Sequence, residues 1–167
     1  MGTKTPPLSP LSTPPFRPPF RLNLLAVILA AILAFLVDAG WYSYFRQLWL
    51  AGIGHTGDWL MANSVNPALQ YATALVSLAV MAAVISYFVQ RTGRQTVFRG
   101  VWIAFWMWLG VVVTTFATDY VFEARSARLY GIDTGVWLVD MIVMGIVVGA
   151  WKTRPAAIAS APPPLKP

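Results

Sequence analysis

Hydrophobic residues are grouped along the chain into four long runs, separated by short polar or aromatic segments. The runs cover residues 22–41, 67–89, 100–118 and 132–151. Because about 20 mostly apolar residues in an α-helix cross the hydrocarbon core of a bilayer, each run predicts one membrane-spanning helix. The pattern therefore predicts an all-α fold, a four-helix transmembrane bundle whose solvent is the lipid bilayer.

Aromatic residues crowd the end of the first run and the segment after it. Tryptophan and tyrosine are enriched at the boundary between membrane and water, so this segment predicts a short interfacial helix between spans one and two. The sequence Asn66-Pro67 predicts the start of the second spanning helix, with Asn as its cap and Pro at its first position. The predicted interface anchors are Trp41, Tyr42, Trp49 and Trp151.

Proline-rich segments flank a membrane domain that we expect to cover residues 22–152. Residues 1–21 and 153–167 predict tails in polyproline II or disordered conformation. The first tail ends in the repeat PPFRPPFR, so it is either a solvated basic tail or a docking peptide anchored by Phe16 and Phe20. A cleaved signal peptide is the alternative for the first run, but three further spans favour a retained helix.

The composition supports a membrane protein, since 57% of the residues are hydrophobic and 11% are charged. There is no cysteine, which excludes disulfides and thiolate chemistry. The net charge of +6 would suggest nucleic-acid binding in a soluble protein. Here the basic residues flank apolar spans, where membrane topology explains them, and we expect no nucleic-acid partner.

The charges divide into two sets if there are four spans. Lys and Arg accumulate in cytoplasmic loops, so the larger basic set predicts that both termini are cytoplasmic, in a multi-pass protein of the bacterial inner membrane. The outer side keeps Arg46, Arg125 and Arg128, and all six acidic residues fall in the outer half. The basic residues on the predicted inner side are Lys4, Arg17, Arg21, Arg91, Arg94, Arg99, Lys152, Arg154 and Lys166.

The fourth run carries a carboxylate, Asp140, inside its apolar sequence. A charged Asp in the hydrocarbon costs about 2.5–3.5 kcal/mol on insertion scales, so it should face protein or water, or be protonated. At 100° per residue, Asp133 shares its face, while Gly145 and Gly149 lie on the opposite one. Small residues at this spacing allow close helix contact in lipid, and the predicted packing residues are Ala26, Ala30, Ala34, Gly145 and Gly149.

Two interpretations of the outer polar residues stay open. One is a structural network in which aspartates pair with the outer arginines. The other is an outward-facing acidic cluster that holds a cation or passes protons. The candidate members of this cluster are Asp38, Asp119, Asp140 and His55.

No catalytic motif is present. The chain lacks a nucleophile elbow, an HExxH sequence, a P-loop and a dinucleotide fingerprint. Its single histidine gives no metal signature and allows no bis-His haem site. We therefore expect no enzyme, no metal and no cofactor.

Several short sequences in the same order along the chain resemble the domain of unknown function 1761 family, small bacterial four-span membrane proteins. They are GWYS at 40–43, WLG at 108–110, FE at 122–123 with Arg125 and LY at 129–130, and MG at 144–145 with Gly149 and Trp151. The resemblance covers residues 22–152 and implies the four-span fold, but no activity. Tyr44 stands where the family pattern implies Pro, and Asp133 where it implies Asn.

These features predict a non-enzymatic membrane protein that acts through helix contacts, as a homo-oligomer or as an accessory subunit with other membrane subunits. The alternative is a small transporter or an ion- or proton-binding protein that uses the acidic cluster. An integral-membrane enzyme acting on lipid is the least supported possibility.

Overall fold

The computed structural model describes residues 20–93 and 95–151. Within these ranges the chain forms helices joined by short turns, and no strand occurs. The all-α prediction is thereby confirmed. The proposed docking peptide with Phe16 and most of both predicted tails lie outside the described residues.

Four helical segments are long and apolar enough to cross a membrane, as the four hydrophobic runs predict. The third is built from three consecutive pieces, because a π-helical turn interrupts the α-helix. The segments are α1 (Leu24–Tyr44), α4 (Pro67–Arg91), α5 (Val97–Met107) with η1 (Trp108–Val113) and α6 (Thr114–Phe122), and α7 (Ala127–Ala150).

Side-chain caps determine where the four segments begin. The first backbone N–H groups of a helix have no partner inside it, and the oxygen of a capping side chain accepts from one of them. Asn66 does this for α4, with Pro67 at the first position as the sequence predicts. The other three capping side chains are Asn23 for α1, Thr96 for α5 and Ser126 for α7.

The cap at Ser126 makes the fourth helix longer than its apolar run. Helix α7 starts at Ala127, and at 1.5 Å per residue the thirteen steps to Asp140 place this residue about 20 Å from the start of the helix. The complete helix has 24 residues. Asp140 is therefore near the middle of α7, deeper than the apolar run indicates.

Two short helices connect α1 to α4, where the sequence predicts one: α2 (Arg46–Ile53) and α3 (Gly57–Asn63). Gly54 ends α2 in the left-handed conformation, with φ of 72°, which glycine adopts without strain. Helix α2 rests on the start of α7, since a Cβ added to Gly52 would lie 2.8 Å from Cδ1 of Leu129.

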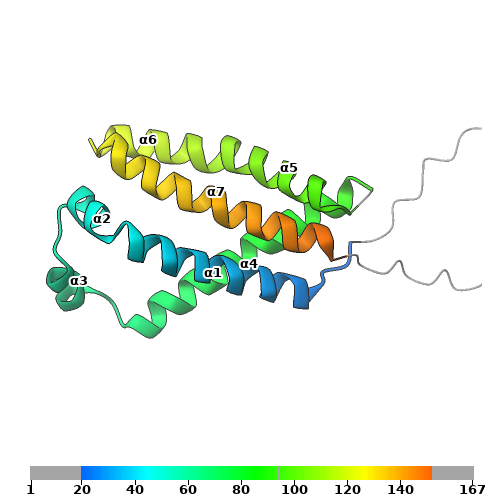
Figure 1. Ribbon diagram of the computed structural model, residues 1–167, viewed down its shortest axis with the longest axis horizontal. Coiled ribbons are helices and arrows are strands. Elements are labelled where there is room, and N and C mark those ends of the chain that lie inside the picture. Colours follow the sequence, from blue (N-terminus) through cyan, green and yellow to red (C-terminus); the bar gives the residue numbers. More distant parts are fainter. Residues whose placement is uncertain (1–19, 94, 152–167) are drawn as a thin grey trace, which may run out of the picture. The chain divides into compact units, whose positions relative to one another are not determined.

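Helix α7 is the central element of the bundle, because it contacts α1, α4 and α5 (Figure 1). Both of its faces are therefore covered by helices of the same chain. In the most apolar 18-residue stretch of α7 half of the residues are buried, whereas 28% or fewer are buried in the corresponding stretches of the other three spans.

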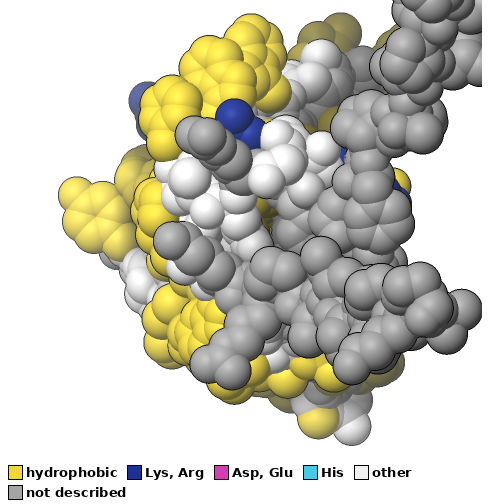
Figure 2. All heavy atoms as spheres, turned by 90° about the vertical axis from the view of Figure 1, so that its right-hand side faces the viewer, with side chains coloured by type: hydrophobic (Ala, Val, Ile, Leu, Met, Phe, Trp, Pro, Cys, Tyr) yellow, Lys and Arg dark blue, Asp and Glu magenta, His cyan; other side chains and the backbone are white. Residues whose placement is uncertain are grey.

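The two ends of the bundle differ in charge. At one end the start of α1 meets the end of α4, where the backbone N–H of Arg21 donates to Oε1 of Gln90. The start of α5 meets the end of α7 at the same end, where Gln95 donates to the carbonyl oxygen of Val148 at 2.8 Å. We call this the basic end, and Figure 2 looks onto it and shows basic side chains among hydrophobic ones. The opposite end, with α2, α3 and the α6–α7 turn, is called the acidic end.

The crossing of α5 and α7 brings two backbones into contact. A Cβ added to Gly145 would lie 2.6 Å from the carbonyl oxygen of Gly100, and one added to Gly149 would lie 2.6 Å from the carbonyl oxygen of Thr96. Conversely, a Cβ on Gly100 would overlap the carbonyl group of Gly145. Glycine is needed at this crossing because no side chain fits between the helices.

The glycine contact can be tested by a matched pair of substitutions on α7. Gly145→Ala should lower stability by about 1–3 kcal/mol, because the new methyl group forces the two backbones apart. Gly131→Ala is the control, since its Cβ would meet nothing within 4 Å and alanine favours the helix. Thermal unfolding of the purified proteins in detergent compares the two, and equal midpoints would contradict the close crossing.

Candidate functional site

Polar groups that are buried in the bundle are concentrated on α7. Of the four buried polar or charged residues in the described part of the chain, three lie on this helix. They are Asp133, Thr134 and Asp140, and the fourth is Ser86 on α4. The candidate functional groups of the bundle therefore lie mainly on α7.

Asp140 faces a second carboxylate. Asp38, from α1, is half-buried, and its carboxyl group interacts directly with that of Asp140. The side chain of Asp140 is 1% exposed, and its Oδ1 atom has no hydrogen-bond partner among the described residues. A buried oxygen without a partner is costly in protein or lipid, so this atom requires an explanation.

Among the described residues, no basic side chain forms an ion pair with either member of this carboxyl pair. Residues 67–90 and 100–118 contain no charged residue, and the ion pair found in the described part of the chain joins Arg125 to Glu123. Two ionised carboxylates close together repel each other, and burial adds the cost of desolvation. The pair therefore needs a bound proton or another cation to be stable.

A second buried carboxylate, Asp133, is fully occupied by tyrosines. The hydroxyl of Tyr42 on α1 donates to its Oδ1 at 3.2 Å, and the hydroxyl of Tyr120 on α6 donates to its Oδ2. An ionised carboxylate offers two accepting oxygens, whereas an amide offers one and adds a donor. Asp at this position, where the family resemblance implies Asn, therefore fits two donors from two different helices.

Two tryptophans donate hydrogen bonds to backbone carbonyl groups of α7. Trp41 on α1 donates its indole N–H to the carbonyl oxygen of Ile132 at 3.1 Å, and Trp108 on η1 donates to that of Thr134 at 2.8 Å. Trp108 is the first residue of the π-helical turn. Such turns occur often at functional sites in helices, and this one is located where the third span meets the polar part of α7.

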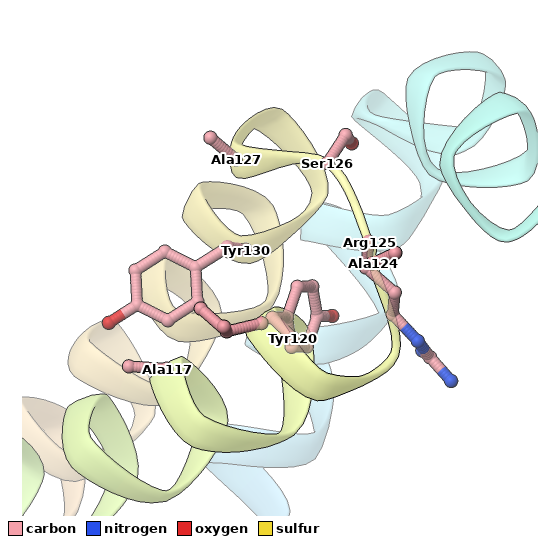
Figure 3. A pocket seen from close by; sticks show the side chains of 8 residues that line it. Ala117, Tyr120, Ala124, Arg125, Ser126, Ala127 and Tyr130 are labelled. Atoms are coloured by element: carbon pink, nitrogen blue, oxygen red, sulfur yellow. The ribbon is translucent and has the colours of Figure 1, made fainter.

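An open groove of about 400 Å³ lies at the acidic end, between α6 and the start of α7 (Figure 3). The guanidinium carbon of Arg125 is 5.4 Å from the centre of the Tyr120 ring. Figure 3 shows Tyr120 and Tyr130 lining the groove, with their hydroxyl oxygens pointing in opposite directions. The residues around the groove are Ala117, Tyr120, Val121, Ala124, Arg125, Ser126, Ala127 and Tyr130.

The structure brings together two of the four candidate members of the acidic cluster. Asp38 and Asp140 meet, whereas Asp119 and His55 are exposed. The His55 ring stacks on Trp59 with 3.6 Å between ring centres. No group of three or more acidic or histidine residues in the described part of the chain could hold a metal ion. The Asp–Arg network that was the other interpretation is also not seen for Asp38 or Asp140.

The predicted packing and anchor residues lie in several environments. Ala26, Ala30 and Ala34 are buried on α1, which contacts α7 and α4. Tyr42 and Trp49 are half-buried and form an edge-to-face pair with 5.6 Å between ring centres. Trp151 follows α7 at the basic end and is exposed.

Sequence reasoning missed the two tyrosines that bind Asp133 and the role of Gly100. A signal existed for Asp133, because it shares a helical face with Asp140. None existed for Tyr120, whose partner lies across a turn on another helix.

The fold defines a small helical protein with four segments that are long and apolar enough to span a membrane. The family described as protein of unknown function (DUF1761) matches residues 25–149, so the chain belongs to this family. The resemblance seen in the sequence is thus confirmed. Comparison with curated proteins gives no match, and comparison with solved structures gives none either.

The hydrogen bonds to Asp133 can be tested by removing one hydroxyl at a time. Tyr42→Phe and Tyr120→Phe should each lower stability by about 1–3 kcal/mol, because a buried carboxylate oxygen loses its donor. The double variant should deviate from the sum of the two effects, since both donors serve one carboxylate. Thermal unfolding in detergent measures this, with Tyr44→Phe, an exposed tyrosine in the same helix, as the control. Additive effects, or losses no larger than in the control, would contradict the shared contact.

Proposed function

We propose that this protein binds and releases a proton at the Asp38–Asp140 carboxyl pair, in the middle of the membrane. The observation that carries the proposal is the buried, unpartnered Oδ1 of Asp140 beside a second carboxyl group. One proton shared by the two groups removes their repulsion and supplies the missing hydrogen bond. Ionisable residues inside membranes belong mostly to ion pathways and proton relays.

A proton suits this pair better than a metal ion does. Ca²⁺ takes six to eight oxygen ligands, and Zn²⁺ is bound mainly by His and Cys. The pair offers two carboxyl groups from two helices whose backbone carbonyls are largely used by helical hydrogen bonds. The chain has no cysteine, and its single histidine is exposed at the α2–α3 turn.

Protonation at this position has a mechanical consequence. With the proton bound, a neutral carboxyl group donates to the carboxylate, which draws α1 and α7 together. Without it, two negative charges push these helices apart. A change of this kind can couple proton movement to the passage of a second solute, so the proposal extends to a small proton-coupled transporter.

Infrared difference spectroscopy on reconstituted protein tests the proposal, since a protonated carboxyl group has its own C=O band. The wild type should show a band that titrates with the pH of the buffer. Asp38→Asn and Asp140→Asn should both lose it, because the asparagine amide cannot take up the proton and donates to the remaining carboxylate.

Asp119→Asn is the matched control, because Asp119 is an exposed aspartate at the end of the third span. This variant should keep the titrating band. A band that survives in both Asp38→Asn and Asp140→Asn would show that the proton is bound elsewhere, and the proposal would fail. Absence of any titrating band in the wild type would have the same meaning.

Association through helix contacts remains the second candidate, and one feature of α4 favours it. Residues 67–73 of this helix are exposed, and Gln70, Thr73 and Ser77 lie on one exposed face. Polar side chains in a span are favourable where they meet another helix. The faces of α7 cannot serve this purpose, because α1, α4 and α5 already cover them. We propose a second copy of the chain as the partner at this face.

Native mass spectrometry of gently solubilised protein tests the association. The wild type should give a dimer, and the double variant Gln70→Leu/Ser77→Ala should shift it toward the monomer. Val76→Leu, at an exposed apolar position of the same helix, is the control and should leave the dimer unchanged. A wild type that is monomeric under these conditions would exclude this candidate.

A further inference from the structure

We propose that the groove at the acidic end binds one phospholipid whose headgroup carries both a phosphate and a primary ammonium group. In this complex the phosphate contacts Arg125, the ammonium group contacts Glu123, and an acyl chain lies along α6 in the groove. The observation behind the proposal is an exposed ion pair beside an apolar groove at the end of two spans. The inference does not depend on proton binding at the carboxyl pair.

The groove lies at the depth where headgroups meet acyl chains. The third spanning segment has 26 residues, so it is about 39 Å long and exceeds the hydrocarbon core of about 30 Å. Its end at Phe122 therefore reaches the headgroup region. Ala117, the groove residue of α6 farthest from this end, lies about 8 Å back along the helix. The groove thus runs from the headgroup region to the outer part of the hydrocarbon.

The walls of the groove are apolar, because the hydroxyl groups of its two tyrosines are used elsewhere in the protein. Tyr120 donates to Asp133, and Tyr130 donates to the carbonyl oxygen of Val113 at 3.0 Å. The two rings and the methyl group of Ala117 therefore form much of the groove surface (Figure 3). Such a surface suits an acyl chain and offers little to a polar solute.

The turn between α6 and α7 fixes the position of Arg125. Its backbone N–H donates to the carbonyl oxygen of Tyr120 at 2.9 Å, and Ala124 before it is left-handed, with φ of 52°. These features form a Schellman motif, which ends the helix at a defined place. The guanidinium carbon lies 5.4 Å from the centre of the Tyr120 ring, and Figure 3 shows the side chain reaching outward from the turn. The fold thus places a cation beside the groove.

Arg125 and Glu123 form an ion pair that is open to solvent. Nε of Arg125 contacts the carboxylate of Glu123, and the two side chains are 42% and 52% exposed. The guanidinium carries its N–H donors in a planar fork that matches a phosphate, and the terminal nitrogens can bind one while Nε keeps Glu123. Exposed ion pairs are weak, so the carboxylate can also turn to a second cation.

The two opposite charges select the class of lipid. A headgroup with a phosphate but no ammonium group is attracted by Arg125 and repelled by Glu123. A zwitterionic headgroup presents a phosphate and an ammonium group a short carbon chain apart, which matches two neighbouring charges of opposite sign. A primary ammonium group donates hydrogen bonds to a carboxylate, whereas a quaternary one has no N–H to donate. The ion pair therefore favours the primary ammonium group.

The surroundings of the groove favour a lipid over a second copy of the chain. Val121, which lines the groove, and Phe122 beside it are largely exposed. Apolar surface that no helix covers at this depth is in contact with lipid, which the membrane supplies at high concentration. The surface proposed for self-association lies on α4 instead.

Native mass spectrometry of the delipidated full-length protein in detergent tests the proposal. Lipids with identical acyl chains and phosphoethanolamine, phosphoglycerol or phosphocholine headgroups are added one at a time, and the bound fraction is measured. The wild type should bind one phosphoethanolamine lipid about fivefold more tightly than either of the others, as expected for one exposed charge contact.

Arg125→Gln should weaken binding of the phosphoethanolamine lipid by about tenfold, because the phosphate loses a charged donor. Glu123→Gln should remove the preference for phosphoethanolamine over phosphoglycerol. Arg128→Gln is the matched control, since Arg128 is an exposed arginine at the same end that does not line the groove, and it should bind like the wild type. Ala127→Leu narrows the groove at an exposed position and should also weaken binding, which provides a second variant in case Arg125→Gln does not fold.

Equal binding of the three lipids by the wild type would overturn the site. Wild-type binding in folded Arg125→Gln or Ala127→Leu, or an equal loss in Arg128→Gln, would do the same. Release of the lipid by excess inorganic phosphate would indicate a site for free anions, and a dimer that excludes the lipid would assign the groove to a second copy. The proposed function is decided separately, by the titrating carboxyl band of Asp38 and Asp140.

Discussion

The structure depends on a constraint that the membrane imposes on α7: two buried carboxylates must be satisfied without water. Asp133 is satisfied by hydroxyl groups from α1 and α6, and these contacts hold the half of α7 at the acidic end between two neighbours. Asp140 meets another carboxylate instead, and one of its oxygens stays without a donor. The same helix thus carries one complete polar site and one incomplete site, and the incomplete one gives the protein its candidate chemistry.

The packing of α7 also bears on how the protein could work. At the basic end its glycines lie against the α5 backbone, so this half has little freedom to move. At the acidic end α7 buries Leu129, Ile132 and Val136 and also accepts hydrogen bonds from tyrosine and tryptophan side chains. The half of α7 at the acidic end, where the groove opens, is thus held by polar contacts as well as by apolar packing.

Helices of the same chain cover both faces of α7, so the sequence pattern of this helix does not require an external partner. Glycines on one face and a carboxylate on the other suggest a helix that binds two partners, and here both are helices of the same bundle. The part of α4 that carries Gln70 is exposed in the described part of the chain, so it is the surface to which the proposed self-association is assigned. The proposed proton binding and the proposed self-association concern different helices and are compatible.

The sequence by itself determined the four spans, since the length and apolarity of each run follow from the thickness of the bilayer. It also determined the family and the start of α4 at Asn66-Pro67, because these depend on local residues. Only the tertiary structure decided that Asp38 meets Asp140 while Asp119 and His55 stay outside, since helical spacing orders residues on one helix but leaves the rotation between helices open. The hydrogen bonds of two tyrosines to Asp133 and the close contact of Gly100 with Gly145 could not be predicted from the sequence for the same reason. Each depends on how helices that are distant in sequence cross.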